Sequence, residues 1–247
     1  MKAKTFTIEE LARQGRARLK AKADPVKAAG ARKYFKEAAE FYGVAAPDVR
    51  AIASDLYATI RNEWSVDDAI RYCDLMFREP ELEAKALGAL VLIRYKKVLP
   101  RSVFGRTKAW LAADLLDNWA SVDTFCPEAL GAVLVRYPDL VERIRGWARH
   151  PNRWVRRASI VSFLKLARNE AYSETIYEVI RSHFGTGDDL IQKAAGWLLR
   201  EVGKRDMKRL EGFLLEHGPS IPRTTLRYAI ERFEPKTRAR LLRETRG

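Results

Sequence analysis

The sequence predicts an all-α protein folded as a curved α-solenoid of antiparallel helical pairs. Apolar residues recur at helical spacing along nearly the whole chain of 247 residues, and runs typical of strands are scarce. Proline and glycine residues stand between the amphipathic stretches, where they end one helix and begin the next. These observations predict about thirteen or fourteen helices of roughly 10–18 residues, joined by short turns.

The expected helix boundaries can be followed along the chain. Thr7, with Glu10 three residues later, predicts a capping box at the start of the first helix. Pro25, Pro47 and Pro222 stand near helix starts, where proline is tolerated. Further junctions are marked by Pro80, Pro100, Pro138 and Pro151.

Two segments predict more local detail. Between Glu81 and Lys96 a helix is expected to bury one apolar face, formed by Leu82, Ala86, Ala89, Leu90 and Ile93. The run His217-Gly218-Pro219-Ser220 predicts a helix stop followed by a new cap.

The expected helices form pairs with a period of about 35–40 residues, the length of HEAT-type repeats. Stacking such pairs would give a concave face along one side of the solenoid. Because no Ser/Gly-rich or Pro-rich linker divides the chain, we expect a single domain over residues 1–247. A compact helical bundle is the alternative architecture.

The charge balance limits the classes of partner. There are 46 Lys and Arg residues against 32 Asp and Glu, which gives a net charge of +14. This excess fits nucleic acid, an anionic membrane surface or an acidic protein, or it serves solubility alone. No apolar run approaches the roughly 18 residues of a membrane helix, and no apolar signal segment precedes the first helix. We therefore expect a soluble, cytoplasmic protein.

No cofactor is expected. Cys73 and Cys126 lie among apolar residues, which favours buried thiols over a disulfide. His150, His183 and His217 are not spaced as metal ligands. A glycine-rich phosphate loop is also missing from the sequence. We therefore expect neither a metal nor an organic cofactor.

Basic residues gather on three successive predicted helices. The first group surrounds Trp147 and Trp154 and comprises Arg143, Arg145, Arg149, His150, Arg153, Arg156 and Arg157. A second helix carries a stripe at i, i+4, i+7 and i+11, formed by Lys193, Trp197, Arg200 and Lys204. A third offers Arg223 and Arg227. Such faces in succession predict a cationic groove for duplex DNA, because each phosphate contact releases counterions. Ordinary solvated helix faces are the alternative.

Trp119 and Asp123 are four residues apart and so share a helix face. Arg157 follows Trp119 by 38 residues, and Trp197 follows Arg157 by 40, close to the repeat period. Equivalent positions of a solenoid stack on one face, so these four residues are expected to converge in the groove. A carboxylate between two indole rings would stabilise a cation. The alternatives are a carboxylate favoured by the helix dipole and a tryptophan that simply packs.

Three segments carry a resemblance to a known family. Residues 118–123 (NWASVD), 150–157 (HPNRWVRR) and 191–201 (IQKAAGWLLRE) resemble the bacterial alkylpurine DNA glycosylases built from HEAT-like repeats, the AlkD type. The similarity includes residues 33–36 (KYFK) and 41–43 (FYG) and weakens toward the C-terminus. It implies a helical solenoid that grips duplex DNA and excises N3- and N7-alkylated purines in base excision repair.

The resemblance also implies roles for individual residues. Asp123 matches the family's catalytic carboxylate, and Trp119 and Trp197 match the two tryptophans that line the deoxyribose of the lesion. Arg157 matches the arginine that holds the DNA backbone, and Tyr34 an aromatic residue near the lesion. Further DNA-binding positions are Lys165 and Arg200, to which the basic helix faces add Lys193 and Arg156.

Two departures and two rival functions remain open. Asn118 stands where some relatives have a second tryptophan, and Arg156 where some have a neutral residue, but neither removes a catalytic group. One rival is a catalytically silent DNA-binding relative. The other is a HEAT-type scaffold that binds an acidic protein partner. A monomer that associates with DNA in the bacterial nucleoid is the expectation for the glycosylase.

Overall fold

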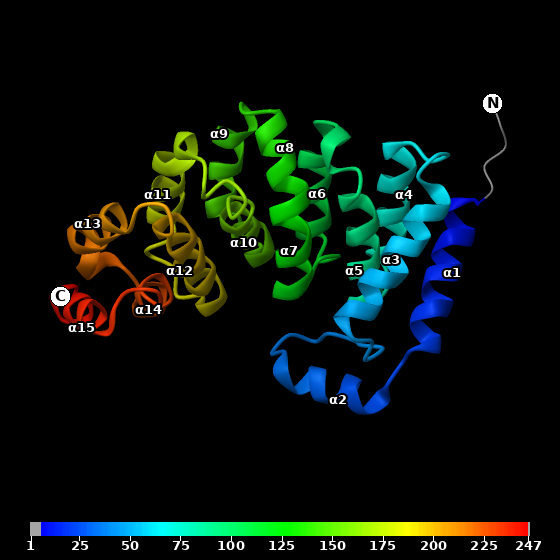
Figure 1. Ribbon diagram of the computed structural model, residues 1–247, viewed down its shortest axis with the longest axis horizontal. Helices are drawn as coiled ribbons and strands as arrows, with labels where there is room; N and C mark the ends of the chain where they lie inside the picture. The colour runs from blue at the N-terminus through cyan, green and yellow to red at the C-terminus, as the bar shows by residue number, and fades with distance from the viewer. Residues whose placement is uncertain (1–5, 247) are drawn as a thin grey trace. The chain divides into compact units, whose positions relative to one another are not determined.

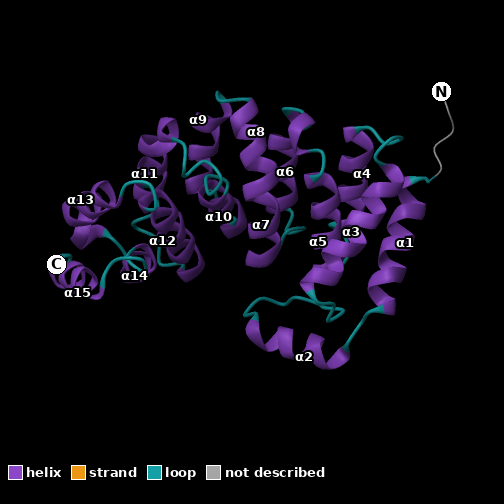
Figure 2. Ribbon diagram, viewed as in Figure 1, coloured by secondary structure: helices purple, strands orange, loops and turns teal. Residues whose placement is uncertain are grey.

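The computed structural model describes residues 6–246, and the regular structure within them is helical (Figure 1 and Figure 2). One isolated bridge, between Glu40 and Glu81, is the only β-type pairing in this range. The prediction of an all-α protein is therefore confirmed. None of the helices in the described range is long and apolar enough to cross a membrane.

Contacts divide the chain into two compact units, one up to Val133 and one from Leu134 onward, and each is described by itself. A single domain over residues 1–247 stays a prediction. The division falls inside α8 (Gly131–Arg136). The first unit holds α1 (Ile8–Ala21), α2 (Pro25–Tyr34), α3 (Ala46–Ile60), α4 (Val66–Met76), α5 (Leu82–Ile93), α6 (Ser102–Ala112) and α7 (Trp119–Phe125). The second holds α9 (Leu140–Arg145), α10 (Arg153–Val161), α11 (Ser173–Arg181), α12 (Asp189–Gly203), α13 (Met207–His217), α14 (Arg223–Ala229) and α15 (Pro235–Glu244).

Within each unit, alternate helices pack side by side. In the first unit α5 contacts both α3 and α7, and in the second α12 contacts both α10 and α14. Contact between every second helix is what stacked helical pairs produce, since one member of each pair joins a common layer. This packing confirms the predicted α-solenoid class. The predicted site residues of α7, α10 and α12 all lie on helices of these layers.

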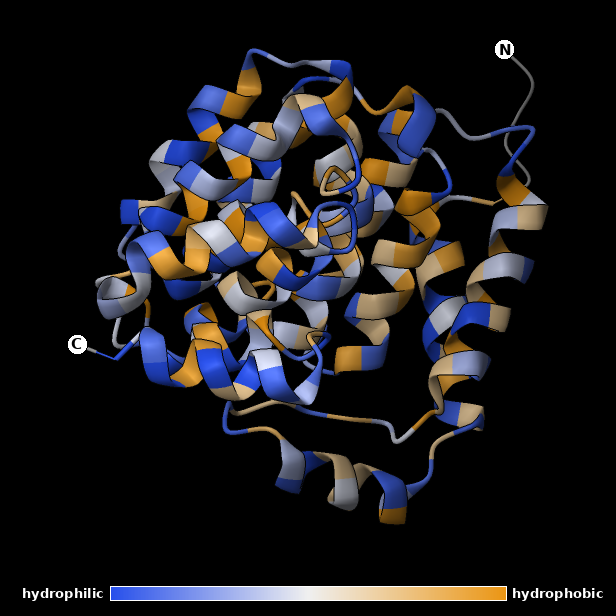
Figure 3. Cartoon of the chain, turned by 60° about the vertical axis from the view of Figure 1, so that its left-hand side comes forward, coloured by the Kyte–Doolittle hydropathy of each residue, from blue (hydrophilic) through white to orange (hydrophobic). Residues whose placement is uncertain are grey.

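Several predicted helix boundaries are present. The N–H of Thr7 donates to Glu10 Oε2 at 2.8 Å, and the N–H of Glu10 donates to Thr7 Oγ1 at 3.1 Å, which completes the capping box. Pro25 is the first residue of α2, and α13 ends at His217. Hydrophobic and hydrophilic residues interleave along the helices of each unit (Figure 3), as amphipathic packing requires.

The prediction for α5 is wrong in its detail. Of the five residues expected to form its buried face, only Ala89 is buried. The helix contacts α1, α3, α4 and α7, so most of its surface is covered. Its other buried residues are Glu83, Ala84, Lys85, Leu87, Gly88, Val91 and Leu92. A helix covered on several sides has no single apolar stripe, and here it also buries two charged side chains.

In contrast, α2 is a helix without buried residues. Val26 is 82% exposed and Tyr34 is 75% exposed. Figure 1 shows α2 apart from the other helices of the first unit, joined to them at its two ends. Burial of an apolar face therefore does not hold α2 in place, and its position depends on its terminal segments.

The two cysteines are free and buried, as predicted. Burial raises the pKa of the Cys73 thiol well above its ordinary value, so this thiol is protonated at neutral pH.

A buried histidine in the second unit makes stability depend on pH. His183 is 4% exposed, and its Nε2 lies 3.1 Å from Ser159 Oγ. Burial, with a smaller effect of the Arg156 charge, lowers the pKa of His183 to about 4. The unfolded chain, with a histidine pKa near 6.5, binds the proton first as pH falls. The stabilisation by neutral His183 is therefore complete above pH 6.5 and is lost as pH falls toward 4.

We expect the variant His183→Gln, which has no imidazole to titrate, to lose this part of the acid sensitivity. The parent chain should lose about 3 kcal/mol more unfolding free energy between pH 6.5 and 4 than the variant does. Urea denaturation at a series of pH values measures the difference. Parallel pH profiles for the two chains would contradict the assignment.

Candidate active site

Helix α7 carries Trp119 and Asp123 one turn apart. The helix begins at Trp119 because Asn118 caps it, with Asn118 Oδ1 accepting the N–H of Ser121 at 2.9 Å. Trp119 and Asp123 are both partly exposed. Their i, i+4 spacing puts an indole ring and a carboxylate on the same accessible helix face.

The helix changes its winding after Phe125, two residues beyond Asp123. Residues 126–130 form a π-helical turn, in which the N–H of Gly131 donates to the carbonyl oxygen of Cys126. Pro127 explains the change, because it has no N–H to donate to the carbonyl of Asp123, its partner in an α-helix. Turns of this kind are frequent at functional sites. The π turn is therefore a local irregularity caused by Pro127, and it begins three residues after Asp123.

Trp119 is the centre of an aromatic cluster. Its ring stacks on Phe35, with centroids 4.9 Å apart and planes 8° from parallel. Tyr34 meets Trp119 edge to face at 6.0 Å. Phe41 lies against the other ring of the stack, 5.1 Å from Phe35. The C-terminal end of α2 is thus attached to the start of α7 by ring contacts.

Two members of this cluster, Tyr34 and Trp119, are predicted site residues, and the structure brings them together. Phe35 and Phe41 are further members that the sequence does not predict as site residues. The signal for them is their place in the segments KYFK and FYG, which carry the family resemblance.

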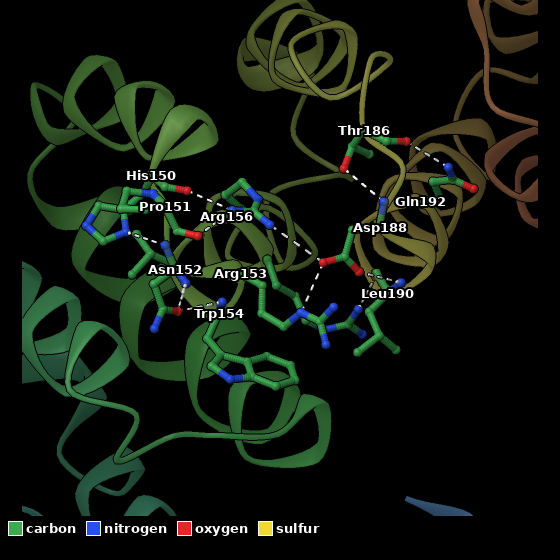
Figure 4. A network of polar contacts seen from close by, with 12 residues as sticks. His150, Pro151, Asn152, Arg153, Trp154, Arg156, Thr186, Asp188, Leu190 and Gln192 are labelled. Carbon is green, nitrogen blue, oxygen red and sulfur yellow. Dashed lines mark hydrogen bonds and ion pairs between the residues drawn. The ribbon is translucent and has the colours of Figure 1, made fainter. Parts of the chain in front are cut away.

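In the second unit, Arg153 and Arg156 on α10 point toward the start of α12 (Figure 4). Arg153 Nε donates to Asp188 Oδ2 at 3.0 Å, and Arg156 Nη2 lies 3.6 Å from the same oxygen. Arg156 Nη1 also donates to the carbonyl oxygens of His150 and Pro151, at 2.8 and 2.7 Å. These guanidinium groups therefore join α10 to the residue that caps α12.

Arg157 is the most deeply buried of the predicted DNA-binding residues. Its residue surface is 5% exposed, and Nη1 donates to the carbonyl oxygen of Leu190 in the first turn of α12. Burial of a guanidinium requires such partners. Arg157 thus fixes α12 relative to α10. Lys165, by comparison, is exposed beyond the end of α10.

The predicted stripe on α12 is partly covered. Trp197 is half-buried, Lys193 pairs with Asp189 at 2.7 Å, and Arg200 pairs with Glu231. Beside Trp197, α14 approaches closely at Gly196, where an added Cβ would lie 2.5 Å from Tyr228 Cβ. The stripe is therefore a helix face whose cations are ion-paired and whose indole ring is half-buried.

Arg223, the first residue of the third predicted basic face, is bonded within the protein. Arg223 donates from Nη2 to the carbonyl oxygen of Leu242 at 3.0 Å and from Nη1 to Thr245 Oγ1 at 3.2 Å. Burial, followed by the charges of Arg246 and Arg227, lowers the pKa of Arg223. Arg223 thus holds the end of α15, and a face of solvated cations does not form at this residue.

The structure brings the predicted residues together within each unit. Tyr34, Trp119 and Asp123 lie around the start of α7, and Arg156 and Arg157 lie against the start of α12, the helix of Trp197. The convergence of these two sets in one groove stays a prediction. Among the described residues, no group of three His, Cys, Asp or Glu side chains is arranged to hold a metal ion.

Comparison with known proteins identifies the family. The sequence model of the DNA alkylation repair enzyme family matches residues 16–233. The chain belongs to this family. Membership implies a role as an enzyme of DNA repair and a DNA substrate.

One solved structure of this family is similar over nearly its whole length. It is described as a predicted DNA alkylation repair enzyme from Enterococcus faecalis and shares 20% sequence identity with this chain. The similarity covers 87% of this chain and 98% of that one, with a TM-score of 0.75. At this identity the likeness shows a common fold. A search of curated proteins finds no match.

The loop that carries Phe41 depends on a glycine. Gly43 has φ of +80°, and a Cβ there would overlap the carbonyl oxygen of Asp24 and lie 2.7 Å from the N atom of Ala28. We expect Gly43→Ala to cost about 1–3 kcal/mol of unfolding free energy. Gly30→Ala is the matched control, because no atom lies within 4 Å of its added Cβ. Denaturant unfolding should show this control as neutral or stabilising; equal losses would contradict the assignment.

Proposed function

We propose that this member of the DNA alkylation repair enzyme family is a DNA glycosylase. Its substrate would be duplex DNA that contains cationic N3- or N7-alkylated purines, and its reaction would begin base excision repair. The observation that carries the proposal is the pairing of Asp123 with Trp119 on one accessible face of α7. Family membership and the net charge of +14 support DNA as the substrate.

The chemistry needs few groups because the substrate is already activated. Alkylation at N3 or N7 makes the purine cationic, so the base departs with the electrons of its bond to C1′ as a neutral molecule. No general acid is required for that departure. Positive charge then grows on the sugar, and a carboxylate in a partly dry site stabilises it. Water adds to C1′ and gives up a proton, which leaves an abasic deoxyribose.

In this proposal Asp123 stabilises the oxocarbenium-like sugar and orients the attacking water. Trp119 and Trp197 present ring faces to the deoxyribose, where their quadrupoles attract positive charge. Tyr34 contacts the nucleotide from the exposed end of α2. Each of these roles is carried over from the family to the matching residue of this chain.

The basic residues would bind DNA in two ways. Lys165 would contact phosphate directly, because its side chain is exposed. Arg157 is hydrogen-bonded to the start of α12, and the two together would hold the DNA backbone. Lys193, Arg200 and Arg156 would add to the same phosphate-binding surface of the second unit, alongside their ion pairs.

The first test replaces the proposed catalytic carboxylate. Asp123→Asn should bind duplex DNA as the parent does but release 7-methylguanine about 100-fold more slowly or worse, because one preorganised charge is lost. Single-turnover release from methylated duplex DNA is the measurement. Asp114→Asn, the same change on an exposed turn of the same unit, is the control and should excise at the parent rate.

An Asp123→Asn variant as fast as the parent would contradict the catalytic assignment. Duplex binding without release by the parent would instead identify the catalytically silent relative. A chain with no preference for DNA would identify the protein scaffold.

The second test concerns phosphate contacts. Lys165→Gln should lower the slope of log affinity against log salt concentration by about 1, because one fewer counterion is released on binding. Lys236→Gln on α15 makes the same charge change at an exposed position without a proposed role. Salt titrations of duplex binding compare the two variants. Identical slopes for both would remove Lys165 from the interface.

A further inference from the structure

Helix α5 buries a pair of charged side chains. Glu83 and Lys85 are each 5% exposed, two residues apart on one helix. Burying a charge costs free energy unless partners replace the lost water. Lys85 is bonded to the segment directly before Trp119, and Glu83 is bonded to the loop that follows Phe41.

Lys85 anchors the residues directly before Trp119. Its Nζ lies 2.7 Å from Asp117 Oδ1, and the same oxygen accepts Asn118 Nδ2 at 3.1 Å. Asn118 in turn caps α7 through the N–H of Ser121. The ammonium therefore fixes the two residues that precede Trp119 and the capping bond that starts its helix.

Glu83 anchors the loop that follows Phe41, a member of the aromatic cluster. Its Oε1 accepts the N–H of Gly43 at 2.8 Å and of Val44 at 3.1 Å, and Oε2 accepts the N–H of Tyr42 at 3.0 Å. Three backbone donors on one buried carboxylate make a rigid loop. Phe41 directly precedes these residues.

The contacts continue from that loop to the indole. Phe41 packs against Phe35 at 5.1 Å, and Phe35 stacks on Trp119 at 4.9 Å. Phe35 follows α2, a helix with no buried residue, so its ring contacts with Phe41 and Trp119 join that end of α2 to the rest of the unit. Lys85 is thus bonded to Asp117, two residues before Trp119, and Glu83 is bonded to the backbone that follows Phe41.

We propose that Glu83 and Lys85 are positioning residues for Trp119 in the excision reaction, with Phe35 and Phe41 as the ring support between them. The inference rests on the proposed function for its catalytic part. The interaction of a ring face with a developing cation depends on distance and orientation, and displacements near 1 Å can cost about 100-fold in rate. Neither charge touches the substrate, so their effect passes through Trp119.

The test is a double-mutant cycle with Trp119→Phe. In the parent background, Lys85→Met and Glu83→Gln should each slow single-turnover release of 7-methylguanine by about 10- to 100-fold, with duplex affinity changed by less than about threefold. In the Trp119→Phe background the same changes should have little further effect, because residues that act through one group are not additive. Lys85→Arg, which keeps the charge, should recover most of the rate.

Two further variants separate positioning from stability. Lys22→Met, which breaks an exposed ion pair with Asp48 in the same unit, is the matched control and should leave the rate unchanged. Phe41→Leu removes the ring support without disturbing a buried charge and should behave like Glu83→Gln. Equal rate losses with and without Trp119, or no loss in any variant, would overturn the inference.

A spectroscopic reading does not depend on activity. The emission of the parent minus that of Trp119→Phe reports the surroundings of Trp119 alone. Lys85→Met and Phe41→Leu should shift this difference spectrum to longer wavelength as the ring gains water, whereas Lys22→Met should not. An unshifted spectrum in both would overturn the positioning role. If the spectrum shifts and the parent releases no base, the positioning stands and the proposed function fails.

Discussion

The stacking of Trp119 on Phe35 is the contact on which the geometry of the proposed active site depends. It joins the start of α7 to the end of α2, a helix that has no buried residue of its own. Helix α7 packs on α5 through buried residues that include Val122 and Phe125. The segments that carry the stack are in addition bonded to Lys85 and Glu83, the charges buried on α5, and in the proposal these bonds set the position of the accessible ring.

This arrangement explains why a site for a cation can be built from few residues. A single carboxylate and aromatic faces stabilise positive charge only if their positions are set before the charge develops. The capping bonds of Asn118 and the loop held by Glu83 set those positions in the folded chain. In the proposed reaction few groups contact the substrate, and buried groups hold those few in position.

The positive charge of the chain has two uses. Part of it is internal: Arg153 and Arg156 meet Asp188, and Arg157 and Arg223 satisfy backbone carbonyls. Such guanidinium groups replace water around helix ends and fix one helix against the next. Lys165 is exposed, and in the proposed function it contacts phosphate. A net charge does not distinguish cations that satisfy internal partners from cations at the surface.

The sequence predicted the all-α fold and several helix boundaries, whereas the convergence of the candidate site residues stays a prediction. Local rules placed the capping box at Thr7 and the start of α2 at Pro25, because such signals act over a few residues. The buried face of α5 differs from the prediction because four other helices pack around it. The spacing of apolar residues in the sequence does not show that a helix is covered on several sides. Phe35, Glu83 and Lys85 were missed for the same reason, since their partners lie far away in the sequence.

In the proposed reaction the protein breaks the glycosidic bond of a base that is already cationic, by stabilising the sugar and without protonating the base. Release of 7-methylguanine, which is cationic, can be compared with release of hypoxanthine, which is neutral, from otherwise identical duplexes. We expect enzyme-dependent release of 7-methylguanine and none of hypoxanthine. Equal release of both bases, or release of neither, would contradict the proposed reaction.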